Sequence, residues 1–408
     1  MMFLEYAVWG AWAPVLGVYL AKTLGFTGDQ IGTIYLALPL ACAISPFLGG
    51  QVADRWVPTQ YFLAVSHLLC GVAFLFMATQ GTYGPFLWTM AVASLIYAPT
   101  LALTNSLAFH HMEDVDKEFG GIRVWGTIGW IVASWGLTFW RVGVQRGWMP
   151  EVGQGDLLYL AGAFAIILGL FCFFLPHTPP AKEAKSPWAF IEAVSMLKNK
   201  NFLVFMIISF IVATELQFYY VPTSAFLVDL GVPEAQVPGW MTLAQIAEIF
   251  TMAFALGYYL PRLGYRKSLA IGVIAWPIRY LVFVVGKPLW LVIASLTLHG
   301  ICYVFFFTVG MVYVDSVAPR DIRASAQSLF AVVVLGIGSA IGSKFVGLVW
   351  DYFSQHGPAG EILSTDWRLL YLVPCGLTIA CAAAFLMFFR EEMPTEEKPA
   401  AEEAVQPQ

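Results

Sequence analysis

Long apolar runs separated by short polar segments decide what this chain can fold into. A helix that crosses a bilayer needs about 20 mostly apolar residues. The sequence holds twelve such stretches, at residues 2–22, 31–53, 61–79, 86–108, 120–141, 157–176, 202–222, 239–260, 268–286, 290–314, 325–350 and 369–389. Charged residues make up only 12% of the chain, against about 25% in soluble domains. We therefore expect an all-α membrane protein with twelve transmembrane helices in a lipid bilayer.

The positions of Lys and Arg predict how these spans are oriented. With the N-terminus inside, thirteen basic residues fall in cytoplasmic segments and five in outer loops. This excess satisfies the positive-inside rule, so both termini are expected in the cytoplasm. The first apolar run leads directly into the second, and no cleavable signal is predicted.

The longest internal polar stretch, residues 177–201, divides the spans six and six. It predicts an N-terminal half (1–176), a cytoplasmic linker (177–201) and a C-terminal half (202–389). A short helix in the linker, with Trp188, Ile191 and Val194 on one side, is expected to lie on the membrane surface. The six glutamates and three prolines of residues 390–408 predict a disordered acidic tail.

The two halves repeat a pattern after their second span. Gly50 precedes Arg55 by five residues, and Gly257 precedes Arg262 by the same distance, at an offset of 207 residues. Two six-helix halves related by a parallel repeat are the arrangement of major facilitator transporters. The GxxxDR core of GQVADRW resembles the loop signature of that superfamily, so Asp54 and Arg55 are expected to gate the cytoplasmic side. Alternatively, Arg55 is only an inside-positive anchor.

Several chemistries find no support in the sequence. The six cysteines lie in apolar runs without Cys/His clustering, which predicts neither disulfides nor a metal site. No Walker A lysine motif is visible, so ATP is not expected to supply energy. No segment combines a nucleophile, a base and an orienting group, so we expect no enzyme, no cofactor and no nucleic-acid partner.

Polar side chains inside the apolar runs point to function, because ionisable groups are costly at membrane depth. Arg123, Thr127 and Trp130 share one face of the fifth span. Gln245 and Glu248 share one face of the eighth. A carboxyl group at mid-membrane favours its protonated form until water or a cation approaches, as a proton-coupled symporter requires.

Two further spans contribute polar or aromatic side chains. Gln217 and Tyr220 form one face of the seventh span, and Tyr303 offers aromatic surface in the tenth. Glu215 points elsewhere, and we expect it to pair with a basic group such as Arg279 or Lys344. His299, one turn before Tyr303, is interpreted as a hydrogen-bonded interior residue.

A series of motifs then carries a specific likeness: VWGAW, GQVADRW, APTLALTNS, IRVWGTIGW, LPHTPP, TELQ, QIAEI and IRASAQSLF. The chain resembles the bacterial nucleoside:proton symporters, a family of the major facilitator superfamily. The resemblance implies an inner-membrane carrier that functions as a monomer and binds a nucleoside between the fifth, seventh, eighth and tenth spans. Substrate contacts are implied for Arg123, Thr127, Trp130, Gln217, Tyr220, Gln245, Glu248 and Tyr303.

Three positions depart from the family pattern. Tyr220 stands where other members have asparagine, and Val304 stands where they have aspartate. Glu248 is therefore the expected proton carrier, with Glu5, which replaces a family glutamine, as the second candidate. We predict a proton-coupled nucleoside importer; a proton-linked carrier of a sugar or nucleobase, or a non-transporting membrane sensor, stays open.

Overall fold

The computed structural model describes residues 1–45, 57–179, 189–319 and 322–390, and this part of the chain is almost entirely helical. Its first elements are α1 (Met2–Trp12), α2 (Leu16–Val18), η1 (Tyr19–Thr23), α3 (Gly28–Ser45), α5 (Thr59–Met77), α6 (Tyr83–His110), α7 (Val115–Gln145), α8 (Asp156–Cys172), α9 (Ala189–Glu192) and η3 (Ala193–Lys198). They are followed by α10 (Lys200–Tyr220), α11 (Thr223–Asp229), η4 (Glu234–Gln236), α12 (Val237–Met241), α13 (Leu243–Phe250), η5 (Thr251–Leu256), α14 (Gly257–Val285), α15 (Leu289–Ser295) and α16 (Leu298–Tyr303). The last elements are η6 (Val304–Thr308), α17 (Val309–Val317), α18 (Arg323–Ala331), η8 (Val332–Gly338), α19 (Ser339–Tyr352), β1 (Ser354–His356), β2 (Ile362–Thr365) and α20 (Trp367–Phe388).

Eight helical segments in the described ranges are long and apolar enough to cross a membrane. One of them, Glu234–Val285, has 52 residues and a non-helical residue at Gly264, so it covers two of the predicted spans. The predicted spans 31–53, 120–141 and 157–176 overlap α3, α7 and α8. The all-helical, multi-pass membrane class is confirmed, whereas the count of twelve spans stays a prediction.

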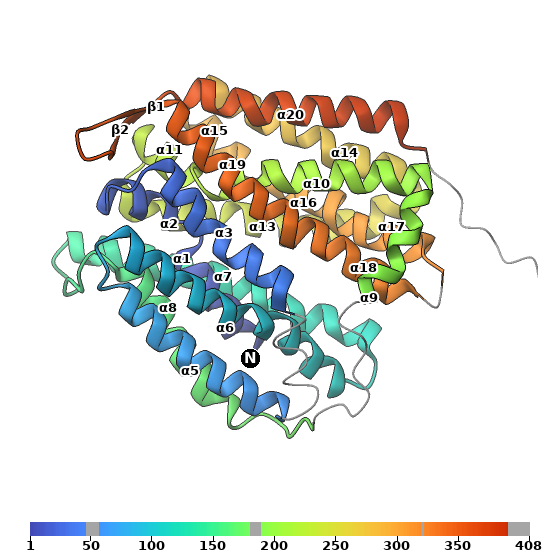
Figure 1. The fold of residues 1–408 in the computed structure, drawn as a ribbon, viewed down its shortest axis with the longest axis horizontal. Coiled ribbons are helices and arrows are strands. Elements are labelled where there is room, and N and C mark those ends of the chain that lie inside the picture. The colour runs from blue at the N-terminus through green and yellow to red at the C-terminus, as the bar shows by residue number, and fades with distance from the viewer. Residues whose placement is uncertain (46–56, 180–188, 320–321, 391–408) are drawn as a thin grey trace, which may run out of the picture.

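The helices form two groups that follow chain order. In Figure 1 the elements up to α8 lie in the lower part of the molecule and those from α10 onward in the upper part. The groups meet where α3 packs along α19 and where α7 packs against α12 and α13. The predicted site helices α7 and α13 are therefore neighbours, although more than 90 residues separate them in the chain.

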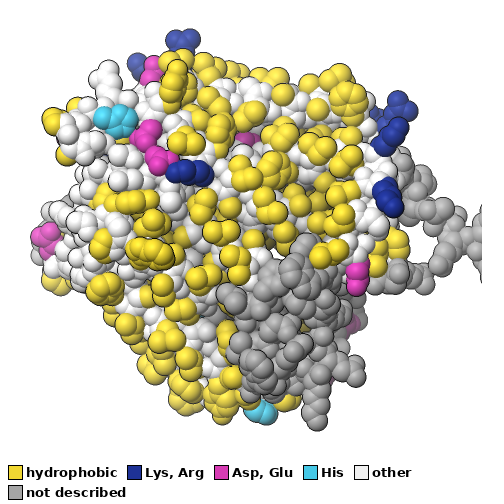
Figure 2. All heavy atoms as spheres, in the orientation of Figure 1, with side chains coloured by type: hydrophobic (Ala, Val, Ile, Leu, Met, Phe, Trp, Pro, Cys, Tyr) yellow, Lys and Arg dark blue, Asp and Glu magenta, His cyan; other side chains and the backbone are white. Residues whose placement is uncertain are grey.

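The outer surface suits a bilayer. Large apolar side chains are exposed along many of the helices, including Trp88, Phe174 and Phe254. Figure 2 shows hydrophobic side chains across the middle of one face, while most of the visible Lys and Arg lie toward its two ends. A contiguous apolar surface of this extent is typical of contact with lipid or a partner.

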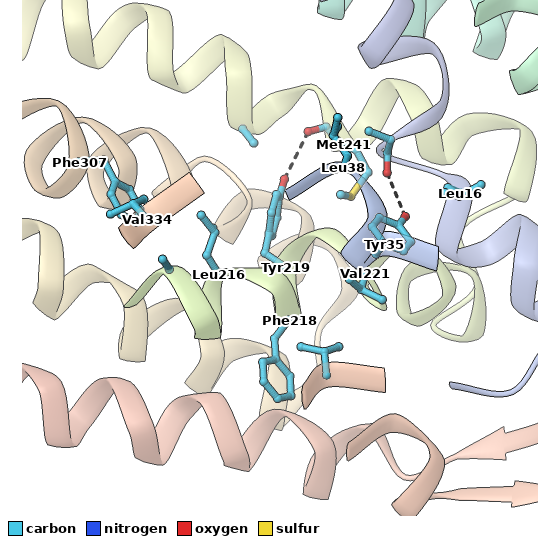
Figure 3. Packing of buried hydrophobic residues seen from close by; sticks show 14 of the residues in the cluster. Leu16, Tyr35, Leu38, Leu216, Phe218, Tyr219, Val221, Met241, Phe307 and Val334 are labelled. Carbon is cyan, nitrogen blue, oxygen red and sulfur yellow. Dashed lines mark hydrogen bonds between the residues drawn. The ribbon is translucent and has the colours of Figure 1, made fainter. Parts of the chain in front are cut away.

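The first span is interrupted, and a neighbouring tyrosine forms hydrogen bonds with the backbone at the interruption. Between α1 and α2 the backbone leaves the helical pattern, which costs free energy inside a membrane unless its polar groups find partners. The Tyr35 hydroxyl on α3 donates to the Ala13 carbonyl oxygen at 3.1 Å and accepts from the Gly17 N–H at 2.9 Å. Figure 3 shows the first of these bonds beside a similar one, in which the Tyr219 hydroxyl donates to the Met241 carbonyl oxygen.

Among the described residues, four spans widen into π-helical turns, one of them at Tyr19–Thr23 (η1), and two of the turns follow predicted site residues. Thr251–Leu256 follows Glu248, Val304–Thr308 follows Tyr303, and Val332–Gly338 precedes α19. Such turns frequently lie at functional sites, because they redirect side chains within a helix. Neither these turns nor the hairpin β1–β2, which pairs Ser354 with Thr365, was predicted from the sequence.

The described part of the predicted linker includes the short helices α9 and η3, and its position on the membrane surface stays a prediction. Ile191 and Val194 are exposed, while Ala193 is buried. The Ser325 hydroxyl donates to the Glu192 carboxylate at 3.3 Å, which ties α9 to α18. Trp188 of this helix, the gate residues Asp54 and Arg55, and tail residues 391–408 fall outside the described residues.

Candidate functional site

The charged centre of the candidate site is formed by Arg123 on α7 and Glu248 on α13. The Arg123 guanidinium carbon lies 4.1 Å from the centre of the Tyr6 ring on α1, a cation–π contact. Arg123 and Glu248 are both half-buried and interact electrostatically, but no direct ion pair joins them in the described structure. The two side chains therefore lie in one region without touching each other directly.

Two tyrosines adjoin this charged pair. Tyr303 on α16 lies close enough to interact electrostatically with Glu248 and Arg123. Tyr220 at the end of α10 interacts in the same way with Tyr303 and Glu248. Both tyrosine rings are partly exposed. Arg123, Glu248, Tyr303 and Tyr220 are four of the predicted site residues, and they come together from four different helices.

Hydrogen-bond chemistry fixes the state of His299, which sequence reasoning left out of the site. The Arg279 Nη1 lies 3.2 Å from His299 Nδ1, and a guanidinium can only donate. Nδ1 must therefore accept, and in the neutral ring the proton resides on Nε2. That Nε2 faces the Tyr220 hydroxyl at 3.5 Å, and the His299 ring stacks on Tyr303 with centroids 5.6 Å apart.

Arg279 is itself fully buried and held by aromatic faces. Its guanidinium carbon lies 4.5 Å from the Tyr219 ring centre, 4.6 Å from that of Trp276 and 5.0 Å from that of Tyr280. Aromatic faces attract a desolvated cation, and Glu215, also fully buried, lies close enough to interact with it electrostatically.

Of its two candidate partners, Glu215 lies near Arg279, but no ion pair joins the two side chains in the described structure. Glu215 interacts with Arg279 electrostatically, and the Tyr280 hydroxyl donates to its main-chain carbonyl oxygen at 3.0 Å. Lys344 instead forms an ion pair with Asp29 on α3. Glu215 therefore lies outside the site, next to Arg279, which contacts His299.

Two buried polar atoms of the site lack a hydrogen-bond partner among the described residues. These are Oε1 of Gln245 and Nε1 of Trp130, on the packed helices α13 and α7. Trp130 meets Trp9 of α1 edge to face, with ring centroids 5.4 Å apart. Buried polar groups nearly always form hydrogen bonds in native proteins. Gln245 can therefore accept a hydrogen bond from a further group, and Trp130 can donate one.

Gln217 and Thr127 are less closely connected to the other predicted site residues. Ser343 on α19 donates to Gln217 Oε1 at 3.4 Å, so this amide group turns toward α19. Thr127 is half-buried on α7, one turn from both Arg123 and Trp130. The described contacts do not join either residue directly to Glu248 or Tyr303.

Glu5 lies apart from this constellation. Its carboxylate is buried against α5 and α6, where it accepts from Thr100 and lies beside His67. Sequence reasoning also missed Tyr6 and Trp9, which place α1 at the site. Their i, i+3 spacing in the first span was a usable signal, because it puts two aromatic rings on one helical face.

Comparison with known proteins supplies the remaining evidence. The family model described as "Nucleoside H+ symporter" matches residues 1–394. YegT of Escherichia coli is 36% identical over 96% of this chain and 92% of its own length. The xanthosine permease of the same organism is 29% identical over 96% and 94%.

A solved structure agrees with these matches. The crystal structure of nucleoside transporter NupG superposes with a TM-score of 0.83 at 29% identity, covering 96% of this chain and 98% of that one. The NupG permease of Escherichia coli is 31% identical over 96% and 94% of the two sequences. The chain therefore belongs to the nucleoside H+ symporter family, a family of membrane transporters, as its motifs predicted.

Proposed function

We propose that this protein imports nucleosides together with protons by alternating access around the site between α7, α10, α13 and α16. In this proposal twelve helices form two six-helix halves, 1–176 and 202–389, that rock about the site. The protein acts as a monomer in the bacterial inner membrane, with both termini in the cytoplasm. Family membership and the likeness to NupG support this proposal.

The observation that carries the proposal is the pair of unpartnered polar atoms between aromatic walls. A nucleoside has a flat base with donors and acceptors on its edge and a ribose with hydroxyl groups. Gln245 Oε1 can accept from such a ligand and Trp130 Nε1 can donate to it, while the rings of Trp130 and Tyr303 enclose the base. A solute with hydroxyls alone would leave the aromatic surface without a flat partner.

Glu248 and Arg123 offer a means of coupling. When Glu248 is protonated it can donate to the solute, and Arg123 rests on the Tyr6 ring. When Glu248 loses its proton, the carboxylate attracts Arg123, and their approach closes the space that the solute occupies. Solute release and proton release toward the cytoplasm are then linked through one side chain.

Uptake of labelled uridine and adenosine, with and without a protonophore, tests this function. We expect uptake above that of empty membranes and its collapse with the protonophore. Glu248→Gln should lose proton-driven accumulation, whereas Glu234→Gln, on an exposed turn, should behave as wild type. The proposal fails if wild-type protein takes up neither nucleoside, or if its uptake ignores the proton gradient.

A competition panel separates the other functions. A sugar carrier would ignore nucleosides and free bases, a nucleobase carrier would prefer the base, and a sensor would bind a nucleoside without moving it. We expect unlabelled nucleosides to compete best for the site.

A further inference from the structure

We propose that Glu5 and His67 form a second proton-binding site, separate from the solute site. This inference rests on the proposed function, since it assigns part of the proton coupling to a pair that does not touch the solute. The described structure supports it through an unusual juxtaposition of two ionisable side chains in the membrane interior.

The pair joins three helices. Glu5 on α1 and His67 on α5 have no exposed side-chain surface, and Glu5 Oε2 lies 2.8 Å from His67 Nε2. Two hydroxyls of α6 donate to the same carboxylate, from Thr100 to Oε1 at 2.8 Å and from Thr104 to Oε2 at 3.2 Å. The Tyr97 hydroxyl donates to the Glu5 main-chain oxygen at 2.6 Å.

Charge counting shows why the pair holds one exchangeable proton. A protonated Glu5 beside a neutral His67 has no net charge, and neither has a carboxylate beside an imidazolium. Removing one proton from either form leaves one net negative charge, which is costly in the membrane interior without a compensating cation. Nε2 of His67 lies against the Glu5 carboxylate, and neither ring nitrogen has a well-directed hydrogen bond to another described residue.

Few other charges face the pair. The groups that interact electrostatically with Glu5 in the described structure are the amino group of Met1, Tyr6, Tyr97, Cys70 and Cys172. The side chains in this set are tyrosines and thiols, and none of them carries a positive charge. No Lys or Arg side chain among the described residues forms an ion pair with Glu5.

α1 connects this pair to the solute site. Tyr6 follows Glu5 directly, and Arg123 rests on the Tyr6 ring. A change in charge at Glu5 that shifts α1 therefore shifts the surface on which Arg123 lies, and Arg123 interacts with Glu248. We infer that the pair loads and releases its proton as α1 moves between the two access states.

Two assays on Glu5→Gln test the proposal. Gln keeps the size of the side chain and one acceptor for Thr100, but it cannot carry the proton. We expect uptake against a gradient to fall at least about tenfold, because accumulation needs net proton movement. Exchange of external for internal nucleoside, which needs none, should keep its rate and KM within about twofold of wild type.

Two further variants separate a proton-binding role of this pair from a structural one. Glu151→Gln, in an exposed loop, should match wild type in both assays. Should Glu5→Gln fail to fold, His67→Gln leaves the carboxylate with its two threonines, and we expect it to change the pH at which accumulation is half-maximal while exchange persists. Equal loss of exchange and accumulation would show a structural role, and unchanged accumulation would exclude Glu5; either result overturns the proposal. If wild-type uptake ignores the proton gradient, the proposed function itself fails.

Discussion

His299 shows how one buried cation determines the chemistry of a neighbouring side chain. Because Arg279 can only donate, it holds the imidazole neutral and directs Nε2–H toward the Tyr220 hydroxyl. His299 therefore serves as a hydrogen-bond donor in this arrangement, and a second proton on its ring would meet the charge of Arg279.

Replacing His299 tests this arrangement. In His299→Leu, the Arg279 guanidinium loses its hydrogen bond to the imidazole ring. A hydrogen bond to a charged group contributes about 1.5–3 kcal/mol, so we expect KM for nucleoside exchange to rise about tenfold. His299→Gln can accept from Arg279 and donate to Tyr220, and its KM should stay within about threefold of wild type.

A double-mutant cycle shows whether the effect passes through Tyr220. Tyr220→Phe should raise KM in wild type but add little in the His299→Leu background, because the hydroxyl has already lost its donor. Fully additive effects would contradict the arrangement, and so would equal KM values for the Gln and Leu variants of His299.

At the residue scale, helical spacing predicted which side chains share a face but not which faces meet. Gln245 with Glu248 and Arg123 with Thr127 follow from the period of an α-helix. Tyr6 could not be predicted beside Arg123, nor His67 beside Glu5, because those contacts depend on how α1 packs against α7 and α5. The gating roles of Asp54 and Arg55, and the substrate and proton-coupling roles of all the site residues, stay predictions.

At the scale of elements, one glycine sets the distance between two site helices. Gly300 on α16 lies against the backbone of α13, where an added Cβ would come 2.7 Å from the Glu248 main-chain nitrogen. The neighbouring atom is backbone, so it cannot move aside as a side-chain end can. The close approach places Tyr303 and Glu248 on adjacent, tightly packed helices.

Gly300→Ala should push these helices apart. Overpacking of this kind costs about 1–3 kcal/mol, and we expect a lower temperature of thermal unfolding and reduced nucleoside uptake. Gly136→Ala on α7 is the matched control, because nothing lies within 4 Å of its added Cβ. An alanine there should be neutral or slightly stabilising. Equal behaviour of the two variants would show that α13 and α16 are not held by this contact.

Most helix positions could be predicted from hydropathy, because lipid demands apolar residues over a fixed length. The predicted span 202–222 corresponds to α10 at 200–220, and 61–79 corresponds to α5 at 59–77. The break between α1 and α2 and the π-helical turns could not be predicted this way. At the break, the Tyr35 hydroxyl of another helix hydrogen-bonds to the Ala13 carbonyl oxygen, and a hydropathy pattern cannot predict such a partner.

At the scale of the whole molecule, contacts between the two groups of helices gather at one end. Asp351 on α19 accepts from the main-chain N–H groups of Gly28, at 2.6 Å, and Asp29, at 2.8 Å, at the start of α3. Lys344 pairs with Asp29 and donates to Thr33, and Lys22 pairs with Asp229. In the predicted orientation this end faces outward, so these residues are expected to close the site to the outside.

Removing the Asp351 carboxylate should loosen this closure. A carboxylate at a helix N-terminus stabilises it through the unpaired N–H groups and the helix dipole, so Asp351→Ala should cost about 1 kcal/mol in the closed state, about a fivefold shift in population. We propose to introduce Thr33→Cys and to measure its labelling in intact cells by a membrane-impermeant maleimide. Labelling should rise about fivefold in the Asp351→Ala background and stay unchanged with Glu234→Ala, which lies on an exposed turn away from these contacts. Asp351 lies on α19 and the labelled residue on α3, so an increase is the result expected when the two groups of helices separate at this end. Labelling that is equally fast in both backgrounds would mean that this contact does not hold the outer side closed.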